Sequence, residues 1–140
     1  MKLKIKKLHP NAVIPQYAKA GDAGLDLVAT SLILDENNNL VYRTGLAIEI
    51  PTGYVGLIFP RSSNSKKDLI LTNHVGVIDS SYRGEIKARF KWMPETTAYS
   101  VGDRCCQMMI IPVDKVEFEE FEGDWEETER NEGGFGSSGV

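Results

Sequence analysis

Apolar and polar residues alternate along several short stretches of this chain, and each stretch predicts a β-strand. The clearest is the stretch 85–92, in which Ile86, Ala88, Phe90 and Trp92 fall on one face. Alternating or continuously apolar stretches predict strands at residues 2–6, 40–50, 54–59, 85–92, 106–113 and 116–121.

Turn-forming residues separate these stretches at short intervals, at 21–24, 35–39, 51–53, 94–97 and 102–103. Helix signals are weak, and the best candidate is a turn or two within residues 64–71. Many short strands joined by turns predict an all-β sandwich, jelly roll or barrel.

The composition fits one domain followed by a flexible end. The chain has 140 residues, of which 41% are hydrophobic and 26% charged, as in folded globular proteins. From about residue 126 apolar periodicity stops and glycine becomes frequent, which predicts a β-rich core at 1–125 and a flexible C-terminal arm at 126–140. No apolar run approaches the ~20 residues of a membrane span, and the basic, alternating N-terminus does not resemble a secretory signal. We therefore expect a cytoplasmic location and no membrane partner.

Charge is distributed unevenly around a net value of −4. Residues 114–132 hold ten acidic side chains against Lys115 and Arg130, so this segment carries −8 and the remainder +4. A mildly basic body suits a small polyanionic ligand, but no stripe of basic and aromatic residues predicts a nucleic-acid partner.

The only cysteines, Cys105 and Cys106, are adjacent in the sequence. Neighbouring residues do not reach ordinary disulfide geometry, and two thiols alone do not make a metal site. Two reduced thiols in or near the core are the expected outcome.

Five segments concentrate glycines, carboxylates, hydroxyls and arginines near the ends of the predicted strands. They are AGDAGLDL at 20–27, PRSS at 60–63, NHVGVIDSSYRG at 73–84, GDRCCQ at 102–107 and RNEGGFGSSG at 130–139. Arg61 with Ser62 and Ser63 supplies donors suited to phosphate. Asp79 follows an apolar run, where a carboxylate can accept a proton from bound water. Taken singly, each segment also fits a solvated turn or a free terminus.

In this order, the five segments resemble the five motifs of the trimeric dUTPase family: AGLDL, PRS, GVIDxxYRG, GDRxxQ and RxxGGFGSSG. The resemblance spans residues 20–139. It implies an all-β, distorted jelly-roll or barrel fold with a mobile glycine-rich arm. The implied reaction is hydrolysis of dUTP to dUMP and pyrophosphate by water attack on the α-phosphorus, which limits uracil incorporation into DNA and supplies dUMP for dTMP synthesis.

The same resemblance implies roles for individual residues. Asp79 activates the water and Tyr82 packs beneath the deoxyribose, while Phe135 closes over the uracil. The implied substrate-binding residues are Arg61, Ser62, Ser63, Asn73, Gly76, Val77, Ile78, Asp79, Tyr82, Lys87, Gln107, Arg130, Phe135, Gly136, Ser137 and Ser138. The implied cofactor is Mg²⁺, held mainly by triphosphate oxygens and water, with Asp26 reaching it through water. The implied assembly is a homotrimer with shared active sites.

Some positions depart from the family pattern. Ser63 stands where glycine is commoner, the stretch before the third motif is about a residue short, and Cys106 replaces a frequent alanine. The pair at 131–132 lies where small or neutral residues are common. None removes a group that the chemistry needs, although the first two affect the expected geometry around the phosphates.

Three other functions fit part of the sequence. A dCTP deaminase or bifunctional deaminase–dUTPase shares the fold, but those chains are usually longer and carry a deaminating glutamate in the third region. A non-catalytic trimeric sensor or protein-binding module would not need Asp79, Tyr82 and Phe135. A jelly-roll capsid or carbohydrate-binding protein leaves the arm unexplained.

Overall fold

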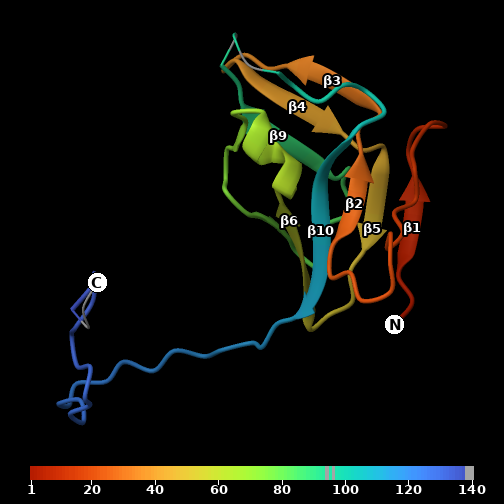
Figure 1. The fold of residues 1–140 in the computed structure, drawn as a ribbon. Helices are drawn as coiled ribbons and strands as arrows, with labels where there is room; N and C mark the ends of the chain where they lie inside the picture. The colour runs from red at the N-terminus through yellow and green to blue at the C-terminus, as the bar shows by residue number, and fades with distance from the viewer. Residues whose placement is uncertain (94, 96, 138–140) are drawn as a thin grey trace.

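The computed structural model describes residues 1–93, 95 and 97–137 and confirms the all-β prediction. Three antiparallel sheets make up the body (Figure 1). Their strands are β1 (Lys4–Lys7), β2 (Leu25–Val28), β3 (Ser31–Leu34), β4 (Asn39–Arg43), β5 (Leu46–Glu49), β6 (Tyr54–Phe59), β7 (Ile70–Leu71), β8 (Gly76–Ile78), β9 (Lys87–Lys91) and β10 (Arg104–Pro112). A 3-10 helix, η1 (Ser62–Lys66), follows β6.

The sheets have the strand orders β1-β5, β2-β10-β6-β8 and β3-β4-β9-β7. Their inner faces bury a single apolar cluster, whose largest fully buried side chains include Tyr42, Phe90, Leu27 and Ile58. Because this core fixes β2, β6 and β10 side by side, residues at their ends are held in a defined arrangement.

The predicted strand at 40–50 is divided in two. Thr44 and Gly45 separate β4 from β5, and Gly45 adopts a φ of +66° that favours glycine. The buried Thr44 hydroxyl donates to the Ile86 carbonyl at 2.8 Å. This corner carries the chain from one sheet to another, which an uninterrupted apolar stretch does not reveal.

The predicted strand at 116–121 is absent, and that prediction was wrong for the single chain. Val113 still donates its N–H to the Gly53 carbonyl, and after it the backbone runs away from the body (Figure 1); residues 113–132 are all exposed. A strand needs a partner for its backbone hydrogen bonds, and this stretch pairs with none in one chain. Phe118 and Trp125 are 96% and 82% exposed.

The helix predicted within 64–71 is also displaced. The 3-10 helix η1 occupies its first part, and Ile70–Leu71 forms β7 instead. Within the described part of the chain, no helix has the length and apolar character needed to cross a membrane.

Candidate active site in two halves

The first half of the site, here called the phosphate half, is a cluster of side chains at the end of β6. Pro60 ends that strand, and Arg61 follows in extended conformation. The Arg61 Nε and Nη2 atoms donate to the two Asp26 carboxylate oxygens at 2.6 and 3.1 Å. Arg104 Nη1 donates to the same carboxylate at 3.3 Å. Two guanidinium groups on one carboxylate leave a net positive charge, as binding of a polyanion requires.

Gln107 joins this cluster through the sheet. It lies opposite Asp26 on β2 and opposite Phe59 on β6. Its Nε2 donates to the Pro60 carbonyl at 2.8 Å, which fixes the turn that presents Arg61. A Cβ at Gly24 would overlap Gln107 Oε1, so glycine there leaves room for the amide in this position. The first, second and fourth sequence segments are therefore neighbours, as the resemblance implied.

The hydroxyls of the PRSS segment differ in their surroundings. Ser62 is exposed at the start of η1, whereas Ser63 is partly covered. The Ser63 Oγ accepts from Arg61 Nη1 at 3.2 Å and also lies 3.2 Å from the Tyr99 hydroxyl.

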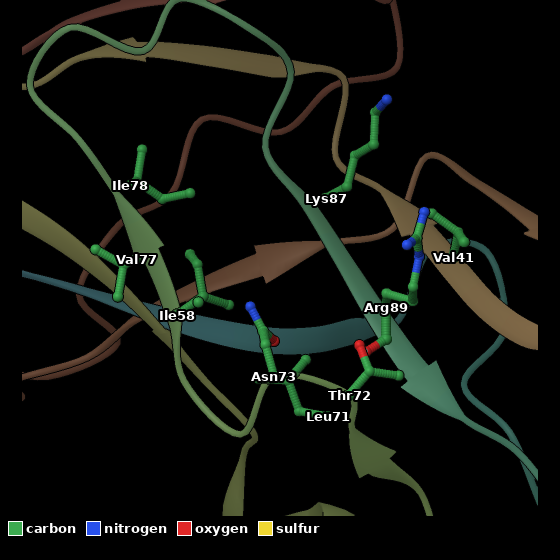
Figure 2. Close-up of a pocket in the computed structure, with 10 residues that line it drawn as sticks. Val41, Ile58, Leu71, Thr72, Asn73, Val77, Ile78, Lys87 and Arg89 are labelled. Atoms are coloured by element: carbon green, nitrogen blue, oxygen red, sulfur yellow. The ribbon is translucent and has the colours of Figure 1, made fainter.

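The second half, here called the base half, is a pocket of about 310 Å³ between β8 and β9. Its lining includes five predicted residues, Asn73, Gly76, Val77, Ile78 and Lys87. In Figure 2 the Asn73 amide points into the space between the two strands, and Lys87 lies at its rim. Apolar walls that also carry the Asn73 amide and the cationic Lys87 and Arg89 suit a small flat ring with polar edges.

Asp79 and Tyr82 follow β8 in a tight turn. The Tyr82 N–H donates to the Asp79 carbonyl at 3.0 Å, and Arg83 Nη1 donates to the carbonyls of Ser80 and Tyr82 at 2.7 and 2.9 Å. The Asp79 side chain is exposed. The Tyr82 hydroxyl donates to the Glu85 carbonyl at 3.0 Å.

The Tyr82 ring lies so close to the backbone that a Cβ at Gly84 would overlap it. Glycine at this position therefore allows the ring to lie across the turn.

Asp79 and the phosphate half lie toward opposite ends of β6, whereas the pocket of the base half borders Ile58 of the same strand. Ile78 pairs with Gly56, and Asp79 lines a hollow of about 380 Å³ together with Val55. Arg61 follows six residues after Val55 in the sequence, and at about 3.3 Å per residue this is roughly 20 Å of extended backbone. The Asp79 and Arg61 backbones of one chain are therefore well separated along β6.

The arm is a third, separate part. Arg130 Nε donates to the Gly133 carbonyl at 2.9 Å, and the Ser137 N–H donates to the Gly134 carbonyl at 3.1 Å. Phe135 is fully exposed, and Gly136 has a φ of +90°. In Figure 1 this segment stands well away from the body. The predicted phosphate contact Ser138 lies outside the described residues.

Comparison with known proteins identifies the family. The dUTPase family model matches residues 10–139. The chain belongs to the dUTPase family. It is 40% identical to the deoxyuridine 5'-triphosphate nucleotidohydrolase of Hydrogenobaculum sp., over 100% of this chain and 99% of that protein.

Two solved dUTPase structures have the same jelly-roll-like fold. The dUTPase of Staphylococcus bacteriophage 80alpha with the dUTP analogue dUpNHpp superposes with a TM-score of 0.82 at 30% identity, over 99% of both chains. A mutant dUTPase from phage phi11 of S. aureus, whose structure reveals the coordination of a structural Mg(II) ion, superposes with a TM-score of 0.74 at 26% identity, over 88% of this chain and 98% of that chain.

Metal-binding groups are sparse in this member of the dUTPase family. Among the described residues, no three His, Cys, Asp or Glu side chains are grouped so that they could hold an ion. Asp26 is a single carboxylate already bonded to Arg61 and Arg104. These residues fit an ion that takes most of its ligands from substrate and water, and they do not fit a cage made by the protein.

Three residues near the site were not identified from the sequence. Arg104 shares the Asp26 carboxylate, Tyr99 contacts Ser63, and Arg89 lines the base half while pairing with Asp35 at 3.1 Å. Arg104 stands inside the GDRCCQ segment, so an arginine beside a predicted site was an available signal. Tyr99 and Arg89 lie outside the five segments, and only the folded chain brings them to the site.

Proposed function

We propose that this chain hydrolyses dUTP to dUMP and pyrophosphate. Two features together carry the proposal. One is the exposed carboxylate of Asp79 next to the pocket of the base half, and the other is a separate cationic cluster around Arg61. Such a division suits a nucleoside triphosphate, because its base and its phosphates need different surroundings. The family relationship names the nucleotide. In the cell this activity limits uracil incorporation into DNA and supplies dUMP for dTMP synthesis.

The reaction begins with a water molecule held by Asp79. The carboxylate accepts a proton as the water oxygen bonds to the α-phosphorus, and the bond from that phosphorus to the α–β bridging oxygen breaks. Pyrophosphate leaves with the electron pair. Arg61, Ser62, Ser63 and Gln107 neutralise and orient the phosphates, so the developing negative charge meets donors already in place.

Selectivity belongs to the base half. The backbone of Gly76, Val77 and Ile78 and the Asn73 amide present hydrogen-bonding groups to uracil, with Lys87 at the rim. The narrow hairpin excludes the 5-methyl group of thymine. Tyr82 packs beneath the deoxyribose, where a 2′-hydroxyl would clash, and Asp79 lies against the 3′-hydroxyl.

Assembly as a homotrimer completes each site. The roughly 20 Å of backbone between Asp79 and Arg61 supports a site that takes its base half from one chain and its phosphate half from another. A closed ring of identical chains satisfies this need for every copy. The arm of a further copy closes the site, with Phe135 over the uracil and Arg130, Gly136, Ser137 and Ser138 over the γ-phosphate. Closure excludes bulk water from the reacting groups.

Magnesium is the cofactor that these residues would accommodate. Bound mainly by the triphosphate and water, with Asp26 reaching it through water, the ion would neutralise phosphate charge. The division into a core at 1–125 and an arm at 126–140 and a cytoplasmic location stay predictions.

Pyrophosphate release measured side by side on dUTP, dCTP, dTTP and UTP tests the proposed function. We expect turnover of dUTP to exceed that of the other three by orders of magnitude, and Asp79→Asn to lower it about 100-fold or more. Ammonia release from dCTP would instead identify a deaminase. Equal rates on dUTP and UTP would remove the role given to Tyr82.

A further inference from the structure

Tyr99 connects the core of the body to the phosphate half. Its side chain is 4% exposed, yet its hydroxyl reaches Ser63 Oγ at 3.2 Å. The same Ser63 oxygen accepts from Arg61 Nη1 at 3.2 Å. A residue of the apolar core therefore touches a predicted phosphate ligand directly.

The backbone of Tyr99 is held firmly by Tyr42. The Tyr42 hydroxyl accepts from the Tyr99 N–H at 2.9 Å and donates to the Tyr99 carbonyl at 3.1 Å. Burial raises the pKa of Tyr42 to about 12, which keeps this hydroxyl protonated. These two hydrogen bonds hold the backbone of Tyr99, so the direction in which its side chain leaves the backbone is fixed.

The ring of Tyr99 is fixed as well. It meets Tyr42 edge-on with centroids 6.0 Å apart and lies 6.4 Å from the Phe90 ring. On another side, Lys67 Nζ lies 4.7 Å from the ring centroid and donates to the Ala98 carbonyl at 3.3 Å. Because the ring is fixed, the phenolic oxygen of Tyr99 has a defined position beside η1.

Hydrogen-bond directions give this contact a chemical consequence. A serine hydroxyl has one hydrogen and two acceptor positions, and phosphate oxygens of a bound triphosphate accept. Arg61 fills one acceptor position of Ser63. If Tyr99 donates into the second, the hydrogen of Ser63 has no competing use within this cluster and is available to the phosphate. If Ser63 donated to Tyr99 instead, its oxygen would offer the phosphate only its one remaining lone pair.

We propose that Tyr99 is a positioning residue of the phosphate half, which donates to Ser63 Oγ and thereby directs the Ser63 hydroxyl hydrogen at the substrate's phosphates. The inference rests on the proposed function, because it takes Ser63 as a phosphate ligand. Ser63 and Tyr99 form this contact through side chains alone, so a glycine at position 63 could not make it.

The variants Tyr99→Phe and Ser63→Ala, with the double variant, test this role. Tyr99→Phe keeps the buried ring and removes only the hydroxyl. One net hydrogen bond corresponds to about two- to tenfold in affinity, so we expect dUpNHpp to bind that much more weakly and kcat on dUTP to fall by a similar factor. Binding of deoxyuridine, which has no phosphates, should not change. Tyr17→Phe, at an exposed tyrosine, is the matched control and should behave as the parent chain.

The double variant separates positioning from general support of the fold. In the Ser63→Ala background Tyr99→Phe should have no further effect on dUpNHpp binding, because its partner oxygen is gone. Additive effects of the two changes, or equal weakening of deoxyuridine and dUpNHpp, would overturn the proposal. So would unchanged dUpNHpp binding and unchanged kcat in Tyr99→Phe. A parent chain that releases no pyrophosphate from dUTP would instead count against the proposed function.

Discussion

The phosphate half and the base half are built in different ways. Arg61, Asp26 and Gln107 contact one another or the adjoining backbone, and they come from three neighbouring strands or strand ends of one sheet. The base half lies instead where β8 of that sheet faces β9 of another, and its carboxylate, Asp79, is exposed. One half is organised before substrate arrives, and the other presents groups that still need a partner.

This difference supports the homotrimer proposed above. Preorganised donors avoid reorganisation during the reaction, and the phosphate half has them within one chain. Asp79, the proposed proton acceptor, is exposed at the other end of β6. None of the predicted phosphate-binding residues of the same chain lies at that end in the part that the structure describes. In the proposed trimer, a second chain brings its phosphate half to this end.

Complementation between two inactive variants tests whether the two halves of one site come from different chains. Asp79→Asn removes the proton acceptor, and we expect turnover to fall about 100-fold or more. Arg61→Ala removes charged hydrogen bonds to phosphate and should also cost about 100-fold. When the two variants are unfolded together and refolded as mixed trimers, about a quarter of the sites should contain both intact halves if chains assemble at random.

Pyrophosphate release by the mixed sample measures the recovery. The two variants, refolded separately and then combined, provide the control and should stay inactive while their subunits do not exchange. A mixed sample that also stays inactive, with both variants folded by circular dichroism, would show that each chain builds its own site.

Removal of the arm gives the next largest effect. A chain ending at residue 129 lacks Arg130 and Phe135, and we expect a turnover loss of about 10- to 100-fold because base stacking and charged contacts are both lost. Stability should hardly change, since the arm extends away from the body (Figure 1). Kinetics and urea unfolding of the same sample check both statements, and full activity of the shortened chain would contradict the assigned closure.

Patterns and motifs in the sequence indicated which residues belong to each half, but they did not indicate how far Asp79 lies from Arg61 along β6. Alternation reports which residues share a face, so β6, β9 and β10 were found with boundaries shifted by two residues or fewer. The order of the motifs indicated their chemistry. Placing Asp79 and Arg61 at opposite ends of β6 required the pairing of Ile78 with Gly56, and strand register depends on contacts across the fold.

Other features were hidden for similar reasons. The corner at Gly45 interrupts an apolar stretch whose composition is that of one strand. The alternation at 116–121 was real, but alternation does not state whether a partner strand is present in the same chain. Tyr99 lies outside the five motifs, and only the folded chain places its hydroxyl beside Ser63.

The ion pair between Arg43 and Glu85, whose backbone carbonyl accepts from the Tyr82 hydroxyl, contributes to stability in a way that varies with pH. Glu85 is 9% exposed and accepts from Arg43 Nε at 2.8 Å and from the Gly45 N–H at 2.9 Å. Burial acts to raise the pKa of Glu85, but the hydrogen bonds and the charges of Arg43 and Lys87 outweigh it and the pKa is lowered. A carboxyl with a lowered pKa in the folded state stabilises the fold above its ordinary pKa, and this contribution is lost as pH falls through the lowered value.

Glu85→Gln should therefore reduce the free energy of unfolding by about 1–3 kcal/mol at pH 7, because a charged hydrogen-bond acceptor is replaced by a neutral amide. Urea unfolding of both chains between pH 7 and pH 3 measures the difference, which should stay constant near neutrality and shrink below the ordinary pKa of glutamate. Glu49→Gln is the matched control. Its partner Lys4 is 84% exposed and 3.2 Å away, so about 1 kcal/mol or less is expected there. A Glu85→Gln difference that persists unchanged to pH 3 would mean that packing, rather than the ionised carboxylate, holds the start of β9 beside the base half.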